Sequence, residues 1–299
     1  MLQVLVDGLI RSAELSLLAV GLTMVYGVLR FANFAHVEFA TVGAYLALPL
    51  AALMPLPIAA VLAIVGAGLI GVLADRVVFA RLRTASPILL MIASFALGII
   101  LRECVRAIWG PSPFFYELGV LAPWRVFDLR ITPTQVAVIA AAAVAILGFH
   151  LLLSRTRLGI AMRATADNAA LAQASAVNSE RVIATVWFIG SAFAALGGVL
   201  VGLNTQVKPD MGFGLIVEVF AAAILGGIGN PYGALLGALV IGFAENIGLA
   251  IDWSSVFGAF GIQTDPFLYI PTGYKAAIPF VLLILTLLVR PQGILGARR

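Results

Sequence analysis

The sequence predicts an all-α polytopic membrane protein with eight or nine transmembrane helices. Of its 299 residues, 62% are apolar and only 11% are charged, and the mean hydropathy is +1.10. Soluble domains carry about 25% charged residues, whereas a spanning helix needs about 20 largely apolar ones. We therefore expect one transmembrane domain over residues 1–299. The formal charge of +4 does not favour a nucleic-acid-binding fold in so apolar a chain.

The expected spans are apolar stretches separated by polar or proline-rich breaks. In order they cover residues 8–29, 33–52, 58–79, 86–107, 134–153, 182–203, 214–229, 234–250 and 274–290. Residues 214–250 are ambiguous because glycines, Asn230 and Pro231 interrupt them. This region forms either two tilted helices or one broken, re-entrant element.

Residues 21–46 and 219–243 share a loose resemblance. Both run from an apolar stretch through a break with glycine and asparagine into a helix of small residues. Repeated halves with interrupted helices are common in transporters, where the breaks approach the substrate path. We therefore predict a weak internal repeat. Glycine also recurs every fourth residue from Gly229 to Gly237 and at Gly198 and Gly202, a spacing typical of closely packed helices.

Lysine and arginine residues predict the orientation in the membrane. Placing residues 80–85, 154–181 and 291–299 on one side, with the nearby span ends, groups 11 of the 18 basic residues and three acids there. The opposite side has seven basic residues and eight acids. Because cytoplasmic loops are rich in basic residues, we expect the N-terminus outside and the C-terminus in the cytoplasm.

Two breaks are predicted to line a translocation path. In the first, Asn33, His36 and Glu38 lie inside an otherwise apolar run, where polar groups are costly unless they face protein or water. The second comprises Gly226, Gly227, Gly229 and Asn230. Irregular backbone is tolerated at membrane depth only against protein or a water-filled cavity. The alternative is structural, with Asn33 and His36 satisfying backbone groups that the break leaves free.

Glu218 and Glu245 are the other acids within the predicted spans. Either could carry a coupled proton, or it could accept a hydrogen bond between helices. We expect no basic partner for them deep in the membrane. The structural role is favoured on this basis.

Residues 154–181 form the longest predicted cytoplasmic segment. Their alanine-rich middle favours a short surface helix, and Asp167 or Asn168 could cap a second turn. The segment is either a solvated connector or a docking helix for a cytoplasmic partner, since simple connectors are usually shorter. Arg163 and Asp167 lie four residues apart on one face and could pair with each other or with that partner. We expect Ala170 and Ala174 to face the partner.

No motif in the sequence indicates an energy source or an enzyme active site. A P-loop needs a glycine-lysine pair followed by serine or threonine, and Lys208 and Lys275, the two lysines, have no such context. The two histidines, His36 and His150, show no metal-ligand or nucleophile-base spacing. We therefore expect no catalytic residue, no metal and no cofactor. A separate ATPase or an ion gradient must drive any uphill transport.

Three stretches carry a resemblance to a known family. They are GLTMVYGVLRFANFAHVEFATVGAYLAL from residue 21, RTRLGIAMRATADNAALA from residue 155 and FAAAILGGIGNPYGALLGALVIGFAE from residue 220. Together they resemble the shorter permease subunit of bacterial branched-chain amino acid ABC transporters, and the similarity runs over essentially the whole chain.

This resemblance implies a multi-pass protein of the bacterial inner membrane with defined partners. These are a second related permease subunit, two cytoplasmic ABC ATPase subunits and a periplasmic substrate-binding protein. The ATPase-contacting segment of the family matches the loop around Arg163, Asp167 and Asn168. Where relatives have an acidic residue or proline and then a glycine, this chain has alanines at 169–170 and Ala-Ser-Ala at 174–176. This departure leaves the turn geometry of the loop open.

Three questions remain open at the level of the sequence. An ion-coupled secondary transporter of small amphipathic solutes, using Glu38, Glu218 or Glu245, is the alternative function. The substrate could be a branched-chain amino acid, another amino acid, an amide, urea or an aromatic acid, because a fold does not select among them. The permease pair could contain one kind of chain or two.

Overall fold

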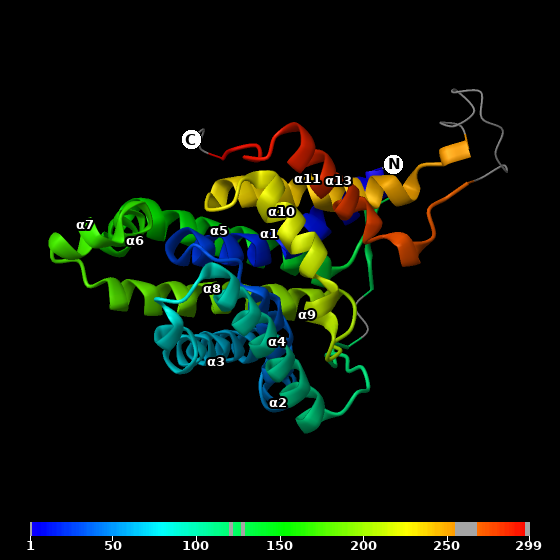
Figure 1. Ribbon diagram of the computed structural model, residues 1–299. Helices are drawn as coiled ribbons and strands as arrows, with labels where there is room; N and C mark the ends of the chain where they lie inside the picture. Colours follow the sequence, from blue (N-terminus) through cyan, green and yellow to red (C-terminus); the bar gives the residue numbers. More distant parts are fainter. Residues whose placement is uncertain (1, 120–121, 127–128, 255–267, 297–299) are drawn as a thin grey trace.

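The computed structural model describes residues 2–119, 122–126, 129–254 and 268–296. Within these ranges, eight helical segments are long and apolar enough to cross a membrane, which confirms the predicted all-α polytopic fold (Figure 1). Their helices are α1 (Leu2–Leu29), α2 (Glu38–Leu53), α3 (Leu56–Val77), α4 (Pro87–Trp109), α5 (Pro133–Arg155), α8 (Ser179–Asn204), α11 (Pro231–Ala250) and α13 (Ala277–Val289).

Shorter elements connect these helices. They are the 3₁₀ turns η1 (Phe34–Val37), η2 (Phe79–Leu82) and η3 (Thr272–Tyr274), the helices α6 (Arg157–Asp167), α7 (Ala169–Ala174), α9 (Met211–Gly214) and α10 (Ile216–Gly226), and the paired strands β1 (Trp124–Val126) and β2 (Leu129–Ile131). Local chemistry explains several helix starts. Thr132, for example, forms a capping box with Gln135 at the start of α5, which satisfies backbone donors at that end.

α10 answers the question that the sequence left open for residues 214–250. It has 11 residues, so it extends only about 16 Å, roughly half the hydrocarbon thickness of a bilayer. α11 has 20 residues and is long enough to span. The expected span 214–229 is therefore a half-helix that ends inside the protein, followed by one full helix.

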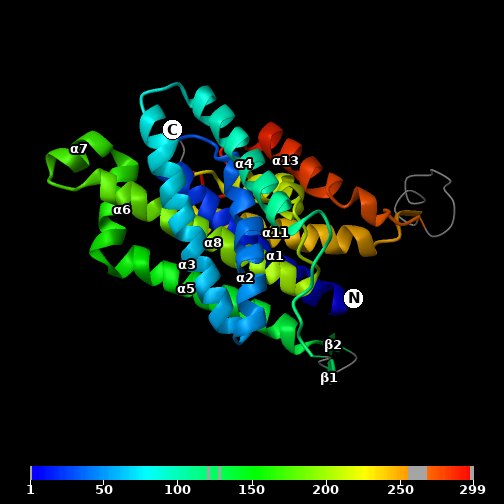
Figure 2. The same cartoon turned by 90° about the horizontal axis from the view of Figure 1, so that it is seen from below.

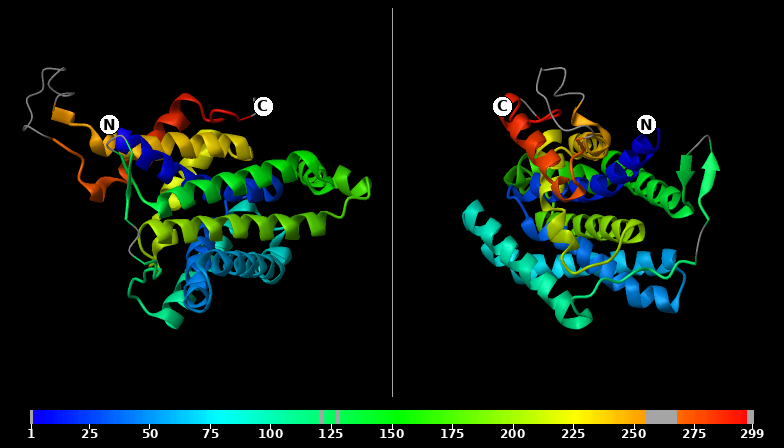
Figure 3. Two further views of the ribbon diagram at one scale, coloured as in Figure 1. Left: turned by 180° about the vertical axis from the view of Figure 1, so that it is seen from behind. Right: turned by 90° about the vertical axis from the view of Figure 1, so that its right-hand side faces the viewer.

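α1 lies at the centre of the bundle and packs against α5, α8, α10 and α11. In addition to α1, α8 packs against α2 and α3, and α5 runs beside α8 (Figure 3). In an apolar stretch of 18 residues within α1, 78% of the residues are buried, compared with 6% in the segment Thr272–Val289, which contains α13. The outer helices therefore present apolar side chains to the surroundings, as lipid or another membrane subunit would require.

Glycine allows the closest helix contacts. A Cβ atom at Gly198 of α8 would overlap the backbone of Ala40 in α2, and one at Gly237 of α11 would overlap the carbonyl oxygen of Ala222 in α10. Gly198, Gly233 and Gly237 thus mark close helix packing, as their spacing predicts, whereas Gly229 lies before α11 and makes no such contact.

The two ends of the bundle differ. The helices α6 and α7 protrude at one end, far from the N-terminus, which lies near the β1–β2 hairpin at the other end (Figures 1 and 2). Arg83 pairs with Glu180 at the α6–α7 end, and Arg30 donates a hydrogen bond to the Ala166 carbonyl there. The structure thus places residues 80–85 beside the end of the segment 154–181.

Candidate translocation site

The first break, residues 30–37, separates α1 from α2. α1 ends at Leu29, and Arg30 takes a left-handed conformation with φ of 59°. Asn33 is extended and caps η1, because its side-chain oxygen accepts a hydrogen bond from the Ala35 amide at 3.1 Å. Asparagine is a favourable residue for this role. The cap satisfies a backbone donor that would otherwise be unpaired inside the membrane domain.

His36 and Glu38 are buried beside this cap. The Nε2 atom of His36 lies 3.0 Å from the carbonyl oxygen of Leu18 in α1. The hydroxyl of Thr41 donates to the Glu38 carboxylate at 3.2 Å and accepts a hydrogen bond from the Gly212 amide at 3.0 Å. These contacts join the first break to α1 and α9. The cap by Asn33 agrees with the structural alternative, whereas His36 contacts a carbonyl in the middle of α1 and not one that the break leaves free.

The second break, residues 226–230, lies between α10 and α11. Gly227 and Gly229 have φ of 108° and 92°, a region that favours glycine. Asn230 caps α11 by accepting hydrogen bonds from two backbone amides, and its side-chain nitrogen donates to the Leu295 carbonyl at 3.0 Å. The amide of Leu295 in turn donates to the Gly226 carbonyl at 2.9 Å. The C-terminal segment therefore covers this break.

A cavity of about 240 Å³ lies between the two breaks. Its lining is almost wholly apolar and comprises Leu22, Thr23, Tyr26, Ala32, Phe34, Met91, Phe220, Ala223, Ile224 and Ile228. The ring of Phe34 stacks on Phe220 with centroids 4.9 Å apart. The hydroxyl of Thr23 is buried without a hydrogen-bond partner. Since an apolar cavity of about 150 Å³ can hold benzene, this one is large enough for a branched aliphatic group.

The residues singled out in the sequence lie beside the cavity rather than on its wall. Asn33, His36 and Glu38 are buried, with exposed fractions of 0–3%, and hold the first break in place. Ala32 and Phe34 from the first break and Ile228 from the second reach the cavity. The sequence could not select them, because isolated apolar residues look the same in a core and in a cavity wall.

A buried ionic cluster corrects the expectation that Glu218 and Glu245 have no basic partner. The Arg11 guanidinium pairs with Glu218, lies 3.4 Å from the Glu245 carboxylate and contacts Glu14 at 3.2 Å. Lys275 also pairs with Glu245, at 3.1 Å. The charges thus tie α1 to α10 and α11. The position of Arg11 within the predicted span 8–29 was the signal that could have revealed it.

The predicted surface helix at residues 154–181 forms two short helices, α6 and α7. Asn168 caps α7 by accepting a hydrogen bond from the Leu171 amide at 3.0 Å, as expected. Arg163 donates to the Leu153 carbonyl rather than pairing with Asp167, so the expected pair is not formed. Ala170 and Ala174 are exposed. After α7, Ala176 has φ of 61°, a left-handed conformation that favours glycine.

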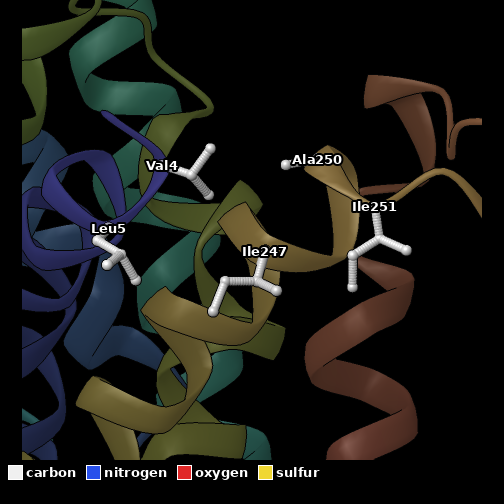
Figure 4. Close-up of a pocket in the computed structure, with 5 residues that line it drawn as sticks. All are labelled: Val4, Leu5, Ile247, Ala250 and Ile251. Atoms are coloured by element: carbon white, nitrogen blue, oxygen red, sulfur yellow. The ribbon is translucent and has the colours of Figure 1, made fainter. Parts of the chain in front are cut away.

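A second apolar hollow, of about 250 Å³, lies between the N-terminal part of α1 and the end of α11. Figure 4 shows the side chains that line it, which are Val4, Leu5, Ile247, Ala250 and Ile251. All five are aliphatic, and none belongs to either break. This hollow therefore adds no polar group that could orient a solute.

A bundle with eight candidate spans, interrupted by two breaks that border an apolar cavity, has the architecture of a membrane transport protein. The chain belongs to the family described as branched-chain amino acid transport system / permease component, whose model matches residues 4–287. The recognition made from the sequence is thereby confirmed.

Curated relatives match nearly the whole chain. The high-affinity branched-chain amino acid transport system permease LivH of Escherichia coli K12 is 32% identical and covers 99% of this chain and 95% of its own length. BraD of Pseudomonas aeruginosa, with the same description, is 34% identical at the same coverages. A probable LivH permease of Methanocaldococcus jannaschii is 33% identical, with coverages of 98% and 92%. No solved structure matches the chain.

Proposed function

We propose that this chain is the transmembrane permease subunit of an ATP-driven ABC importer for branched-chain or related amino acids. Its partners would be a second related permease, two cytoplasmic ABC ATPases and a periplasmic substrate-binding protein. The observation that carries the proposal is the family match over residues 4–287, together with relatives named for branched-chain amino acid transport. The apolar cavity between the breaks is consistent with such a substrate.

We further propose that the N-terminus lies outside and the C-terminus inside the bacterial inner membrane. Residues 80–85 and 154–181 hold many of the arginines, and the structure joins these two segments through Arg83 and Glu180. The N-terminus lies at the opposite end of the bundle (Figure 1). This arrangement agrees with the excess of basic residues expected on the cytoplasmic side.

The path would run through the cavity, with the seven predicted residues framing it. In this proposal Asn33, His36 and Glu38 set the position of the first break, while Gly226, Gly227, Gly229 and Asn230 set that of the second. Gly227 has a positive φ and lies against Gly296, so a side chain there would disturb folding as well as passage. A wall residue with a tolerant backbone gives a cleaner test.

The test uses proteoliposomes that contain the complete transporter and radiolabelled leucine. Ala32→Phe places a ring at the cavity wall and should reduce uptake at least tenfold while the complex still assembles. Ala143→Phe, on the exposed face of α5, is the matched control and should leave uptake unchanged. Unchanged uptake by Ala32→Phe would remove the cavity from the path.

We propose that α6 and α7, the docking helices, receive the ATPase, with Arg163, Asp167, Asn168, Ala170 and Ala174 at or beside the contact. Leu171 and Ile160 support this proposal, since they are 65% and 59% exposed on helices outside the predicted spans. Exposed apolar side chains of this kind mark interaction surfaces.

Charged variants test this docking. Ala170→Glu and Ala174→Glu should abolish co-purification with the ATPase and substrate-stimulated ATP hydrolysis. Thr84→Glu, which adds the same charge to an exposed residue of the 80–85 loop, is the control. Normal association of both alanine variants would leave residues 154–181 as a connector and favour the ion-coupled carrier. The ion pairs of Glu218 and Glu245 with Arg11 argue against these two carboxylates as the coupling groups of such a carrier, because a coupling carboxylate needs to be free.

A further inference from the structure

Arg30 connects the first break to a docking helix. It lies directly after α1, and its guanidinium donates a hydrogen bond to the carbonyl oxygen of Ala166 at 2.6 Å. Ala166 belongs to the last turn of α6, where carbonyl groups lack helical partners and the helix dipole attracts a cation. The arginine therefore reaches from the break to a site on α6 that suits its charge.

The backbone conformation of Arg30 indicates that its side chain has a role beyond forming the turn. Its φ of 59° is in the left-handed region, where helices usually end in glycine because a side chain adds strain. A turn alone would be served better by glycine. The hydrogen bond to Ala166 gives a reason for an arginine in this conformation.

The break continues from Arg30 to the cavity through neighbouring contacts. Phe31 stacks on Phe79 with centroids 5.4 Å apart, and Phe79 stacks on Trp187 of α8 at 4.8 Å. Ala32 and Phe34 then form part of the cavity wall. A displacement of α6 can therefore pass from Ala166 to Arg30 through their hydrogen bond, and then along the chain through Phe31 to Ala32 on the cavity wall.

We propose that Arg30 is a positioning residue that makes the cavity wall follow the movement of α6 when the ATPase changes state. This inference rests on the proposed function, in particular on docking of the ATPase at α6 and α7. It differs from transmission through the flanking helices α5 and α8, because the link runs directly to the first break. Energetic coupling through such a network has to be measured, since contact alone does not establish it.

Three variants distinguish the role of the Arg30 side chain from that of the left-handed turn. Arg30→Gly keeps the left-handed turn but removes the hydrogen bond, and Arg30→Lys keeps a cationic donor. Arg76→Gln removes an exposed arginine from the last turn of α3, whose side chain forms no hydrogen bond or ion pair with the residues that the structure describes. Each is purified with the ATPases and reconstituted, and leucine transported per ATP hydrolysed is measured.

We expect Arg30→Gly to assemble and melt at or above the temperature of the unmodified complex, but to lower the transport-to-hydrolysis ratio at least fivefold. Arg30→Lys should keep more than half of that ratio, and Arg76→Gln should match the unmodified protein. If Arg30→Gly keeps the full ratio, Arg30 serves only the turn and the proposal is wrong. An equal loss in Arg76→Gln would likewise overturn it, because any lost arginine would then suffice.

A direct probe of the wall completes the test. Ala32→Cys is introduced on a Cys104→Ser background, since Cys104 is exposed, and its alkylation rate is measured in the complex with and without ATP plus vanadate. With Arg30 present, the nucleotide state should change the rate at least threefold; with Arg30→Gly it should not. A persistent nucleotide response in Arg30→Gly would overturn this inference alone. Failure of the unmodified chain to bind any ABC ATPase would instead overturn the proposed function.

Discussion

An asparagine caps a helical element at each break, η1 at the first and α11 at the second, but the surrounding chain is held in different ways. At the first break, side chains make the contacts, through Asn33, His36 and the stacked Phe34. At the second, glycine backbones pack against each other, as Gly226 does against Gly233. A side-chain contact can rearrange while the backbone around it persists, whereas close backbone packing leaves little freedom. The first break is therefore the better candidate for a moving part of the transporter.

The ionic cluster around Arg11 holds α10, the half-helix that precedes the second break, to α1 and α11. Arg11→Met should lower the free energy of unfolding by about 3–5 kcal/mol, because it leaves buried carboxylates short of a cation. Denaturant titration of the purified protein in mixed micelles measures this loss. Arg106→Met, at an exposed ion pair with Glu103, should cost less than about 1 kcal/mol. Similar costs for the two variants would contradict a stabilising role for the cluster.

Because the backbone is closely packed at the second break, adding a single methyl group there should also lower the free energy of unfolding, but by less than Arg11→Met does. Gly226→Ala should destabilise by about 2–3 kcal/mol, because the added Cβ would overlap the Gly233 backbone. The same titration compares it with Gly148→Ala in α5, where no atom lies within 4 Å of the new Cβ. That control should be neutral or slightly stabilising, as alanine favours a helix. A neutral Gly226→Ala would mean that the second break is not tightly packed.

The cap of the first break should respond moderately. Asn33→Ala leaves the amide of Ala35 unpaired in a buried site, so we expect a loss of about 1–2 kcal/mol. Asn33→Ser supplies another acceptor oxygen and removes the unpartnered side-chain nitrogen of Asn33. The serine variant should therefore recover most of the stability in thermal melts. Equal losses of stability in the two variants would show that Asn33 does not stabilise the protein by capping η1.

The corresponding cap of the second break should matter least. Asn230→Ala removes hydrogen bonds to Tyr232, Gly233 and Leu295, but these groups lie closer to solvent, and water can replace the lost partner. We expect a loss of about 0.5–1 kcal/mol. A thermal melt beside Asn33→Ala gives the ranking. A larger effect at Asn230 would reverse the comparison and make the second break the side-chain-dependent one.

The sequence anticipated both breaks because their residues stand out against apolar surroundings. Asn33, His36 and Glu38 are polar within a predicted span, and Gly227 and Asn230 favour conformations that end or start a helix. It did not anticipate the partners of Glu218 and Glu245, since Arg11 lies 207 and 234 residues away from them in the chain. The sequence also allowed a pair between Arg163 and Asp167, whereas the Leu153 carbonyl accepts the hydrogen bond of Arg163.

The sequence by itself determined the membrane class, most of the helices and the family of this protein, because hydrophobicity and local capping act over a few residues. Only the tertiary structure decided which residues meet. It reduced residues 216–226 to a half-helix, brought Ala32 and Phe34 opposite Phe220 around a cavity, and joined Arg30 to Ala166. Such contacts depend on how α1, α8, α10 and α11 pack, and packing across long chain separations leaves no periodic signal in the sequence.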